Sequence, residues 1–255
     1  MHILLTNDDG IYALGIQELA KALPEEWRVT IIAPHRERSA YSHMLTVGKE
    51  LQLMEIPSEY ENVRQYAFSG TPADCAKFAL EFHLKDDKPD LLISGINSGY
   101  NLGSDVLYSG TVSAAMEGLF YGVPALALSV KKYSSERGSE IIPFVIEIIH
   151  HIFAMQGFKG CLNVNFPLHG ECDWSQVRVA PQGLQRYANV ISWEGEKEGT
   201  FFLAGHIVED EIEEGTDTDL VRHGFITMTA LTWQQVHEKE QQEMIDVVQQ
   251  LQIIG

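Results

Sequence analysis

The chain has 255 residues, of which 45% are hydrophobic, and a formal net charge of −18 from 36 acidic and 18 basic residues. This length supports one large α/β domain with a sizeable core. The acidic surface excludes nucleic-acid polymers as expected partners, because it repels another polyanion. A small phosphorylated substrate is compatible with it, since one bound cation inverts the field inside a pocket.

Cysteine usage and hydropathy point to a cytoplasmic protein. None of the three cysteines lies in a C-x-x-C pair, which fits reduced, structural thiols. The opening residues, MHILLTNDD, lack the basic region of a signal peptide. The longest apolar helix-like run, residues 141–155, is too short and too polar to span a membrane. We therefore expect no membrane partner.

The first predicted element is a buried strand over 3–6, which runs directly into Asp8 and Asp9. In an open parallel sheet, ligands bind beyond the carboxyl ends of the strands. Two adjacent carboxylates repel each other there, and a hard divalent cation with oxygen ligands relieves the repulsion. The pair is therefore a candidate site for Mg²⁺ or Mn²⁺. The alternative is that both residues cap the next helix and favour its positive end.

Apolar spacing predicts a helix over 16–23, and a second buried strand over 29–33 follows it. Ser39 lies in the loop after that strand, so its hydroxyl could face the acidic pair. The alternative for this serine is a turn residue. Arg36 and Arg38 in the same loop could meet a phosphate, or be solvated or paired with the neighbouring glutamate.

Residues 45–56 are expected to be extended, and a short strand is expected over 66–68. A marked helix start follows, with Thr71 as the candidate N-cap, Pro72 in the first helical position and Asp74 three residues after the cap. Such a helix start could bind an anion. Equally, the carboxylate of Asp74 could simply complete the cap.

The next buried strand, over 91–93, opens into the chain's densest glycine and asparagine stretch, over 94–111. The side-chain oxygens of Asn97 and Asn101 can reach a cation. A helix is predicted to begin at the end of the stretch, where its N–H groups and two hydroxyls would form a phosphate-sized pocket. The alternative is a glycine-rich turn with a hydroxyl cap. The candidate phosphate-binding residues are Asn101, Ser109, Gly110 and Thr111.

Strands are expected over 123–130 and 162–166, separated by a polar loop over 131–139 and a helix over 141–155. Strand and helix alternate as far as this point. The economical interpretation is an α/β fold with a Rossmann-like, doubly wound and mainly parallel sheet.

The last third of the sequence differs. Residues 185–195 and 199–208 have strand character and predict a β-hairpin arm. A strand over 225–231 and a helix over 233–251 follow. The aromatic residues of the arm suggest packing on a partner subunit, or else on its own domain. We therefore divide the chain into a metal-binding catalytic core, 1–184, and an oligomerisation segment, 185–255.

Several motifs together resemble one family, the SurE-type survival proteins, which are stationary-phase nucleotidases. The resemblance covers the length of the chain. Its main motifs are Asn7-Asp8-Asp9-Gly10, Glu37-Arg38-Ser39, Gly70-Thr71-Pro72-Ala73-Asp74-Cys75, Ser94-Gly95-Ile96-Asn97, Tyr108-Ser109-Gly110-Thr111-Val112, Asn163-Val164-Asn165 and Thr216-Asp217.

The resemblance implies a Rossmann-like core with one divalent metal ion per subunit, held by residues that match Asp8, Asp9, Ser39 and Asn97. It implies 5′- and 3′-nucleotidase activity on nucleoside monophosphates, with short polyphosphate as a further substrate of some members. It also implies dimers or tetramers formed through swapped C-terminal elements. The sequence departs from the family where a glycine is replaced by Ala40, and where Tyr41 follows instead of a small residue.

Two functions of different classes follow. In the first, a cation on the four candidate ligands activates a water molecule that attacks the phosphate. The proton acceptor could be Asp8, Asp9 or, less favourably, His43. In the second, the chain senses a nucleotide or phosphate and binds metal without turnover.

Overall fold

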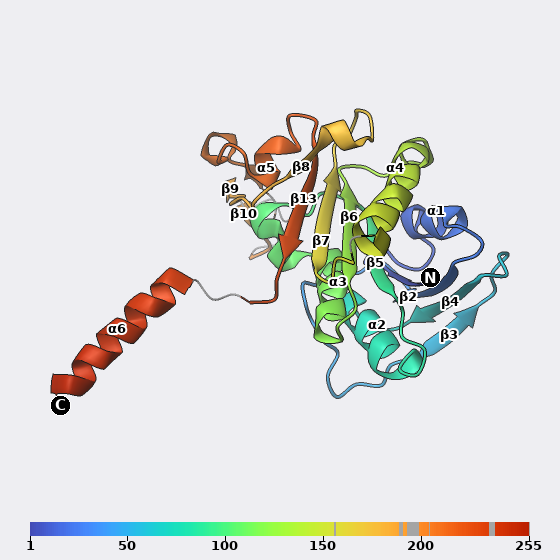
Figure 1. Cartoon of the computed structure of the whole chain (residues 1–255), viewed down its shortest axis with the longest axis horizontal. Coiled ribbons are helices and arrows are strands. Elements are labelled where there is room, and N and C mark those ends of the chain that lie inside the picture. The colour runs from blue at the N-terminus through green and yellow to red at the C-terminus, as the bar shows by residue number, and fades with distance from the viewer. Residues whose placement is uncertain (156, 189–190, 193–198, 204, 235–237, 255) are drawn as a thin grey trace.

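A nine-stranded sheet forms the centre of the molecule in this computed structural model, which describes every residue except 156, 189–190, 193–198, 204, 235–237 and 255 (Figure 1). The strand order is β3-β4-β2-β1-β5-β6-β7-β13-β8. The strands are β1 His2–Thr6, β2 Arg28–Pro34, β3 Leu53–Ile56, β4 Val63–Phe68, β5 Leu91–Ser98, β6 Ala125–Val130, β7 Cys161–Phe166, β8 Val177–Val179 and β13 Ile226–Leu231.

The six strands from β4 to β7 in this order are parallel to one another. The strand β3 is antiparallel to β4, and β13 is antiparallel to β7 but parallel to β8. The chain winds outward in both directions from β1, which has β2 on one side and β5 on the other. The doubly wound, mainly parallel sheet expected from the sequence is confirmed, and the β1–β5 boundary is its switch point.

Helices cover both faces of this sheet, because the core strands are apolar on both sides. On β1, Ile3 and Leu5 join one apolar cluster with residues of α1 and α4, while Leu4 joins a second cluster with residues of α2 and α3. The four helices are α1 Leu14–Ala22, α2 Pro72–Phe78, α3 Gly110–Phe120 and α4 Ser135–Ile148, and π-helical turns at Ala79–His83 and Ile149–Met155 extend α2 and α4.

The predicted starts of α2 and α3 are confirmed. The hydroxyl of Thr71 accepts from the N–H of Asp74 at 3.1 Å, and the carboxylate of Asp74 accepts from the N–H of Thr71 at 2.9 Å, which completes a capping box. Ser109 caps α3 by accepting from the N–H of Val112 at 3.1 Å. These caps fix where α2 and α3 begin relative to the ends of the strands.

Three boundaries differ from the prediction. Within the expected extended segment 45–56, only Leu53–Ile56 forms a strand, because only these residues pair with β4. The expected loop 131–139 is cut short, since the hydroxyl of Ser134 caps α4 at the N–H of Arg137. The three-residue strand β8 was not predicted, and it owes its form to pairing with β13.

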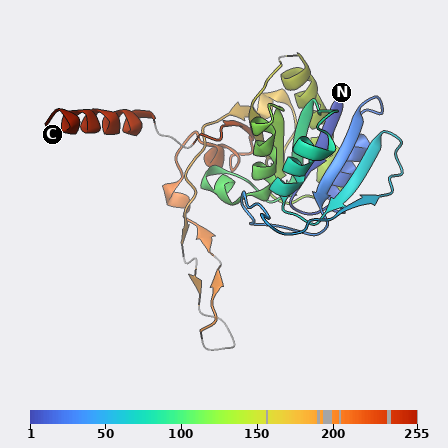
Figure 2. The same cartoon turned by 90° about the horizontal axis from the view of Figure 1, so that it is seen from below.

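The predicted hairpin is present and projects from the body as an arm (Figure 2). Its described strands pair antiparallel, β9 (Tyr187–Ala188) with β12 (His206–Ile207) and β10 (Ile191–Ser192) with β11 (Phe202–Leu203). The rest of the predicted hairpin, 189–190, 193–198 and 204, lies outside the described residues.

The last helix, α6, spans Glu238–Ile254 and extends away from the sheet (Figure 2). It begins later than the predicted 233, and residues 235–237 lie outside the described part. The strand β13 comes from the segment 185–255 that we assigned to oligomerisation, but it lies inside the main sheet. Short helical turns complete the chain: η2 Gly103–Tyr108, η4 Trp174–Gln176, η5 Glu209–Glu211 and α5 Asp217–Leu220. None of the described helices is long and apolar enough to cross a membrane.

Candidate active site

A tight turn at the end of β1 fixes the acidic pair. The side chain of Asn7 bonds Gly10 in both directions, donating to its carbonyl at 2.9 Å and accepting from its N–H at 3.1 Å. Gly10 has φ +100°, and a Cβ there would lie 3.1 Å from the carbonyl carbon of Arg36. The turn therefore needs glycine. It fixes the positions of the two aspartates at the edge of the sheet, of which Asp8 is buried and Asp9 is half-buried.

The buried carboxylate is Asp8, which is 5% exposed and lies against the start of α3. Thr111 donates its hydroxyl proton to Asp8 Oδ1. A Cβ at Gly110 would lie only 2.9 Å from Asp8 Cβ, so glycine lets the helix approach this closely. Burial and the nearby charge of Asp9 raise the pKa of Asp8 to about 6, although the bond from Thr111 opposes the shift.

The second carboxylate, Asp9, is half-buried and accepts from the N–H of Ser98 at 3.3 Å. Burial raises the pKa of Asp9, and the negative charge of Glu37 adds to this effect. Three carboxylates thus influence one another at this edge. A bound divalent cation would favour the ionised forms of Asp8 and Asp9.

The two remaining candidate ligands come from the strands on either side of β1. Ser39 is exposed in the loop after β2, and its hydroxyl donates to Glu37 Oε1 at 2.7 Å. Asn97 lies near the end of β5, where the pairing with β6 shifts register between Ser94 and Asn97. Its side-chain nitrogen donates to the carbonyl of Gly99 at 2.9 Å, so its oxygen, the atom that binds cations, takes no part in that bond.

These four residues fit a hard divalent cation. They are presented by the adjacent strands β2, β1 and β5, at the switch point of the sheet. All offer oxygen, and two are carboxylates, which is the donor set that Mg²⁺ and Mn²⁺ take in proteins. No cluster of three or more His, Cys, Asp or Glu suited to a metal occurs among the described residues. The candidate site has two carboxylates and relies on a hydroxyl and an amide for the rest.

The hydroxyls predicted to bind phosphate are used within the protein. Ser109 caps α3 through its hydroxyl, and the hydroxyl of Thr111 donates a hydrogen bond to Asp8. What the start of α3 leaves for an anion is the N–H group of Gly110, because the N–H group of Thr111 also bonds the carboxylate of Asp8.

Asn101 is buried in a network that the sequence did not predict. Its side-chain nitrogen donates to Ser129 Oγ at 2.7 Å, and its carbonyl accepts from Asn163 at 2.8 Å and Asn165 at 3.0 Å. Asn163 and Asn165 alternate on the buried strand β7, and this period of two is the signal that puts both on one face. The network fixes the backbone that leads to α3.

His43 lies away from the acidic pair. Its Nε2 is 2.8 Å from Glu117 Oε1, and Glu117 is also 3.7 Å from the ammonium of Lys77. Glu117 is seven residues beyond Gly110, or about 10 Å along α3 at 1.5 Å per residue. The geometry therefore favours a structural ion pair for His43, and the nearest bases at the site are the two aspartates.

Comparison with known proteins agrees with the fold and these motifs. A family model described as Survival protein SurE matches residues 3–189. The chain belongs to the SurE family.

Curated relatives within the SurE family align over nearly the whole chain. The "5'-nucleotidase SurE" of Thermoanaerobacter sp. (strain X514) is 40% identical over 238 residues, covering 91% of this chain and 92% of the relative. The "5'-nucleotidase SurE" of Synechococcus elongatus is 38% identical over 247 residues, covering 93% and 95%. The crystal structure of the SurE protein from Aquifex aeolicus superposes with a TM-score of 0.81 at 32% identity, covering 97% of this chain and 99% of that one.

Proposed function

We propose that this SurE chain is a divalent-metal-dependent phosphomonoesterase that dephosphorylates nucleoside 5′- and 3′-monophosphates. The observation that carries the proposal is the contact between Asp8 and the first turn of α3. It joins a candidate cation site to a candidate anion site, and a phosphate ester bridging the two would meet positive charge on both sides. The names of the curated relatives support a nucleotidase.

The proposed mechanism assigns one task to each group. Asp8, Asp9, Ser39 and Asn97 would hold one Mg²⁺ or Mn²⁺ per subunit, which when bound polarises the phosphoryl group and acidifies a bound water. Thr111 keeps Asp8 oriented through its hydroxyl. The N–H group of Gly110 would hold a phosphate oxygen as negative charge develops on it, with Ser109 and Asn101 fixing the backbone that presents this donor.

The direct test is phosphate release from a panel of nucleoside 5′- and 3′-monophosphates, with Mg²⁺, Mn²⁺ or EDTA. Wild type should release phosphate only with metal, and Asn97→Ala should lose that release. Asn62→Ala is the matched control, because its amide bonds the carbonyl of Trp27 away from the site. Metal binding without release from any monophosphate would contradict the enzyme and favour a metal-binding sensor.

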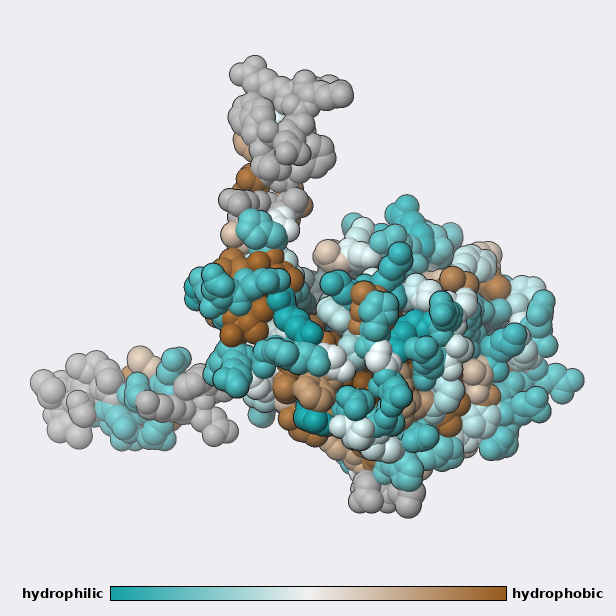
Figure 3. All heavy atoms as spheres, turned by 90° about the horizontal axis from the view of Figure 1, so that it is seen from above, coloured by the Kyte–Doolittle hydropathy of each residue, from teal (hydrophilic) through white to brown (hydrophobic). Residues whose placement is uncertain are grey.

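We further propose that the arm and α6 mediate self-association into dimers or tetramers. Large apolar side chains are exposed on both, among them Ile191 (68%), Leu203 (81%) and Met244 (58%). Brown, apolar atoms gather where the arm leaves the body in Figure 3. Apolar surface of this kind is covered in stable assemblies. A cytoplasmic location and the absence of nucleic-acid partners remain part of the proposal.

A further inference from the structure

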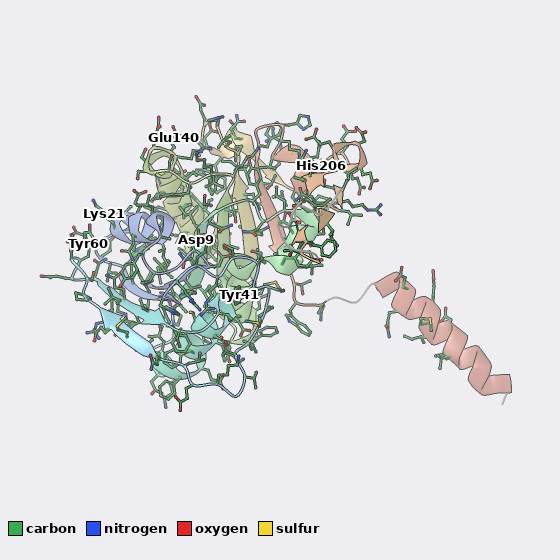
Figure 4. The ribbon with its side chains drawn as sticks, turned by 180° about the vertical axis from the view of Figure 1, so that it is seen from behind. Asp9, Lys21, Tyr41, Tyr60, Glu140 and His206 are labelled. Carbon is green, nitrogen blue, oxygen red and sulfur yellow. The ribbon has the colours of Figure 1, made fainter. Side chains whose placement is uncertain are left out.

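We infer that Arg38, oriented by Tyr41, binds the phosphate group of the substrate at the candidate active site. The inference deepens the proposed function and rests on it for the identity of the ester. It chooses Arg38 over Arg36, the other loop arginine that the sequence offered for a phosphate, and adds a positioning residue that departs from the family's sequence pattern. Figure 4 labels Tyr41, on the loop after β2, and Asp9, at the end of β1.

Hydrogen bonds fix both the backbone and the guanidinium of Arg38. Its backbone N–H donates to the carbonyl of Asp8 at 2.7 Å. At the other end, guanidinium Nη2 donates to the carbonyl of Ser69 at 3.2 Å. Ser69 follows β4 and stands three residues before Pro72, the first residue of α2.

The start of α2 in turn meets the start of α3. A Cβ on Gly110 would lie 3.1 Å from Pro72 Cγ and 2.9 Å from Asp8 Cβ. The start of α3 therefore packs against both Asp8 and the start of α2, and the backbone of Arg38 is bonded to that same aspartate. The N-terminus of α3 contributes partial positive charge, and the guanidinium contributes a full one. An anion is the ligand that such surroundings favour.

The charge on Arg38 lacks an acidic partner. Among the described residues its half-buried guanidinium makes no ion pair, whereas Arg28, Arg137 and Arg222 each pair with a carboxylate. Its Nε is buried without a hydrogen-bond acceptor. A partly buried cation without a counter-ion is costly to fold. A bound phosphate would supply the missing negative charge.

Tyr41 holds the guanidinium in one orientation. Its phenol oxygen accepts from Arg38 Nη1 at 3.2 Å, and its ring centroid lies 5.2 Å from Arg38 Cζ. Ser42, the next residue, bonds the carbonyl groups of Leu107 and Tyr108, the last two residues of η2, which precedes α3. The loop that carries the arginine is thus attached to the segment that leads into the proposed phosphate cradle. A planar guanidinium with a fixed orientation is suited to two phosphate oxygens at once.

Inorganic phosphate is the probe, and calorimetry on the full chain with Mg²⁺ is the measurement. Arg38→Met should weaken phosphate binding by on the order of tenfold to a hundredfold, the range for hydrogen bonds to a charged group. Arg38→Lys should restore part of the loss, because it keeps the charge but not the planar fork. Tyr41→Phe should weaken binding by about threefold, since it removes one hydrogen bond that orients the guanidinium but leaves the charge of Arg38 in place. Arg36→Met, an exposed arginine two residues away, should bind phosphate as wild type does.

The outcomes separate this inference from the proposed function. Unchanged phosphate affinity in Arg38→Met, an equal loss in Arg36→Met, or no phosphate binding by wild type would each overturn the role of Arg38. Should Arg38→Met fail to fold, the affinities of Arg38→Lys and Tyr41→Phe decide, and wild-type values in both would overturn it. Wild type that binds phosphate but releases none from any monophosphate would refute the enzyme while leaving this binding role intact.

Discussion

The carboxyl edge of the sheet and the projecting arm differ in which side chains are buried and which are exposed. At the edge, polar groups are buried and bonded, as Asp8 is by Thr111 and Asn101 by Ser129. On the arm, apolar groups such as Ile191 and Leu203 are exposed, and the two described strands that carry them pair with each other. Buried polar groups make a chemical site, while exposed apolar ones require a partner. Changes at the edge should therefore alter chemistry, and changes on the arm should alter assembly.

The largest expected effect is at the edge. Asp8→Asn should lower kcat/KM for nucleoside monophosphates by about a thousandfold or more, because it removes a negative ligand from the proposed metal site and leaves the charge on the substrate uncompensated. Steady-state kinetics with Mg²⁺ and with Mn²⁺ measure this. Asp86→Asn, an exposed aspartate before β5, is the control and should keep full activity. Equal activity in both variants would contradict a chemical role for the carboxyl edge of the sheet.

The same substitution should stabilise the metal-free protein. The pKa of Asp8 is raised from 3.8 to about 6, so the folded state binds this proton more tightly than the unfolded state does. Its stabilising contribution is complete below pH 3.8 and is lost as pH rises through 6. At pH 7.5 in EDTA, Asp8→Asn should therefore be more stable than wild type by up to about 3 kcal/mol.

Urea unfolding at pH 4.5 and at pH 7.5 measures this difference. The advantage of Asp8→Asn should shrink at the lower pH, where the wild-type carboxyl keeps its proton in the folded state. Asp86→Asn should show no such pH dependence. A variant less stable than wild type at pH 7.5 in EDTA would mean that the buried carboxylate carries no ionisation cost.

A substitution on the arm should change the assembly of the protein and leave the core unchanged. Leu203→Glu should shift the protein toward smaller species, because it puts a charge into the proposed subunit contact, while the unfolding of the core stays unchanged. Light scattering after size-exclusion chromatography measures this. Leu203 is 81% exposed and Val47, on a loop of the core, is 83% exposed, so Val47→Glu is a matched control. If both variants assemble as wild type does, the arm is not the interface.

The smallest effect is expected in the loop that carries Ser39. Ala40 has φ 58°, a left-handed conformation that costs an alanine about 1–2 kcal/mol. Ala40→Gly removes that cost but loses entropy on folding, so a net gain of about 0.5–1 kcal/mol is expected. Ala22→Gly, at the exposed end of α1, should instead lose stability. Thermal unfolding of both variants would measure the difference, and a loss in both would show that the loop carries no strain at this residue.

Local patterns predicted most of the fold. Apolar runs at the centre of β1, β2 and β5 and the caps at Thr71 and Ser109 are properties of a few neighbouring residues. The misses are elements that depend on distant partners. The strand β8 exists because β13, almost fifty residues later, pairs with it. No local pattern carries that information.

The candidate site divides in the same way. Residues at neighbouring strand ends could be grouped from sequence, because parallel strands bring their carboxyl ends to one edge. The hydrogen-bond partners of those residues could not be predicted from the sequence. Thr111 bonds Asp8 across 103 positions, and His43 bonds Glu117 across 74. Such contacts depend on how α3 packs against the sheet, and they give the hydroxyl of Thr111 a bond to the acidic pair that the sequence did not predict.

The most direct test of the central claim is a count of bound metal. We would titrate the full chain with Mn²⁺ and follow free Mn²⁺ by electron paramagnetic resonance, in wild type, Asp8→Asn, Asn97→Ala and the control Asp86→Asn. One Mn²⁺ per chain in wild type and the control, with loss or strong weakening in Asp8→Asn and Asn97→Ala, is the predicted result. Equal binding in all four proteins would contradict a metal site formed by Asp8, Asp9, Ser39 and Asn97.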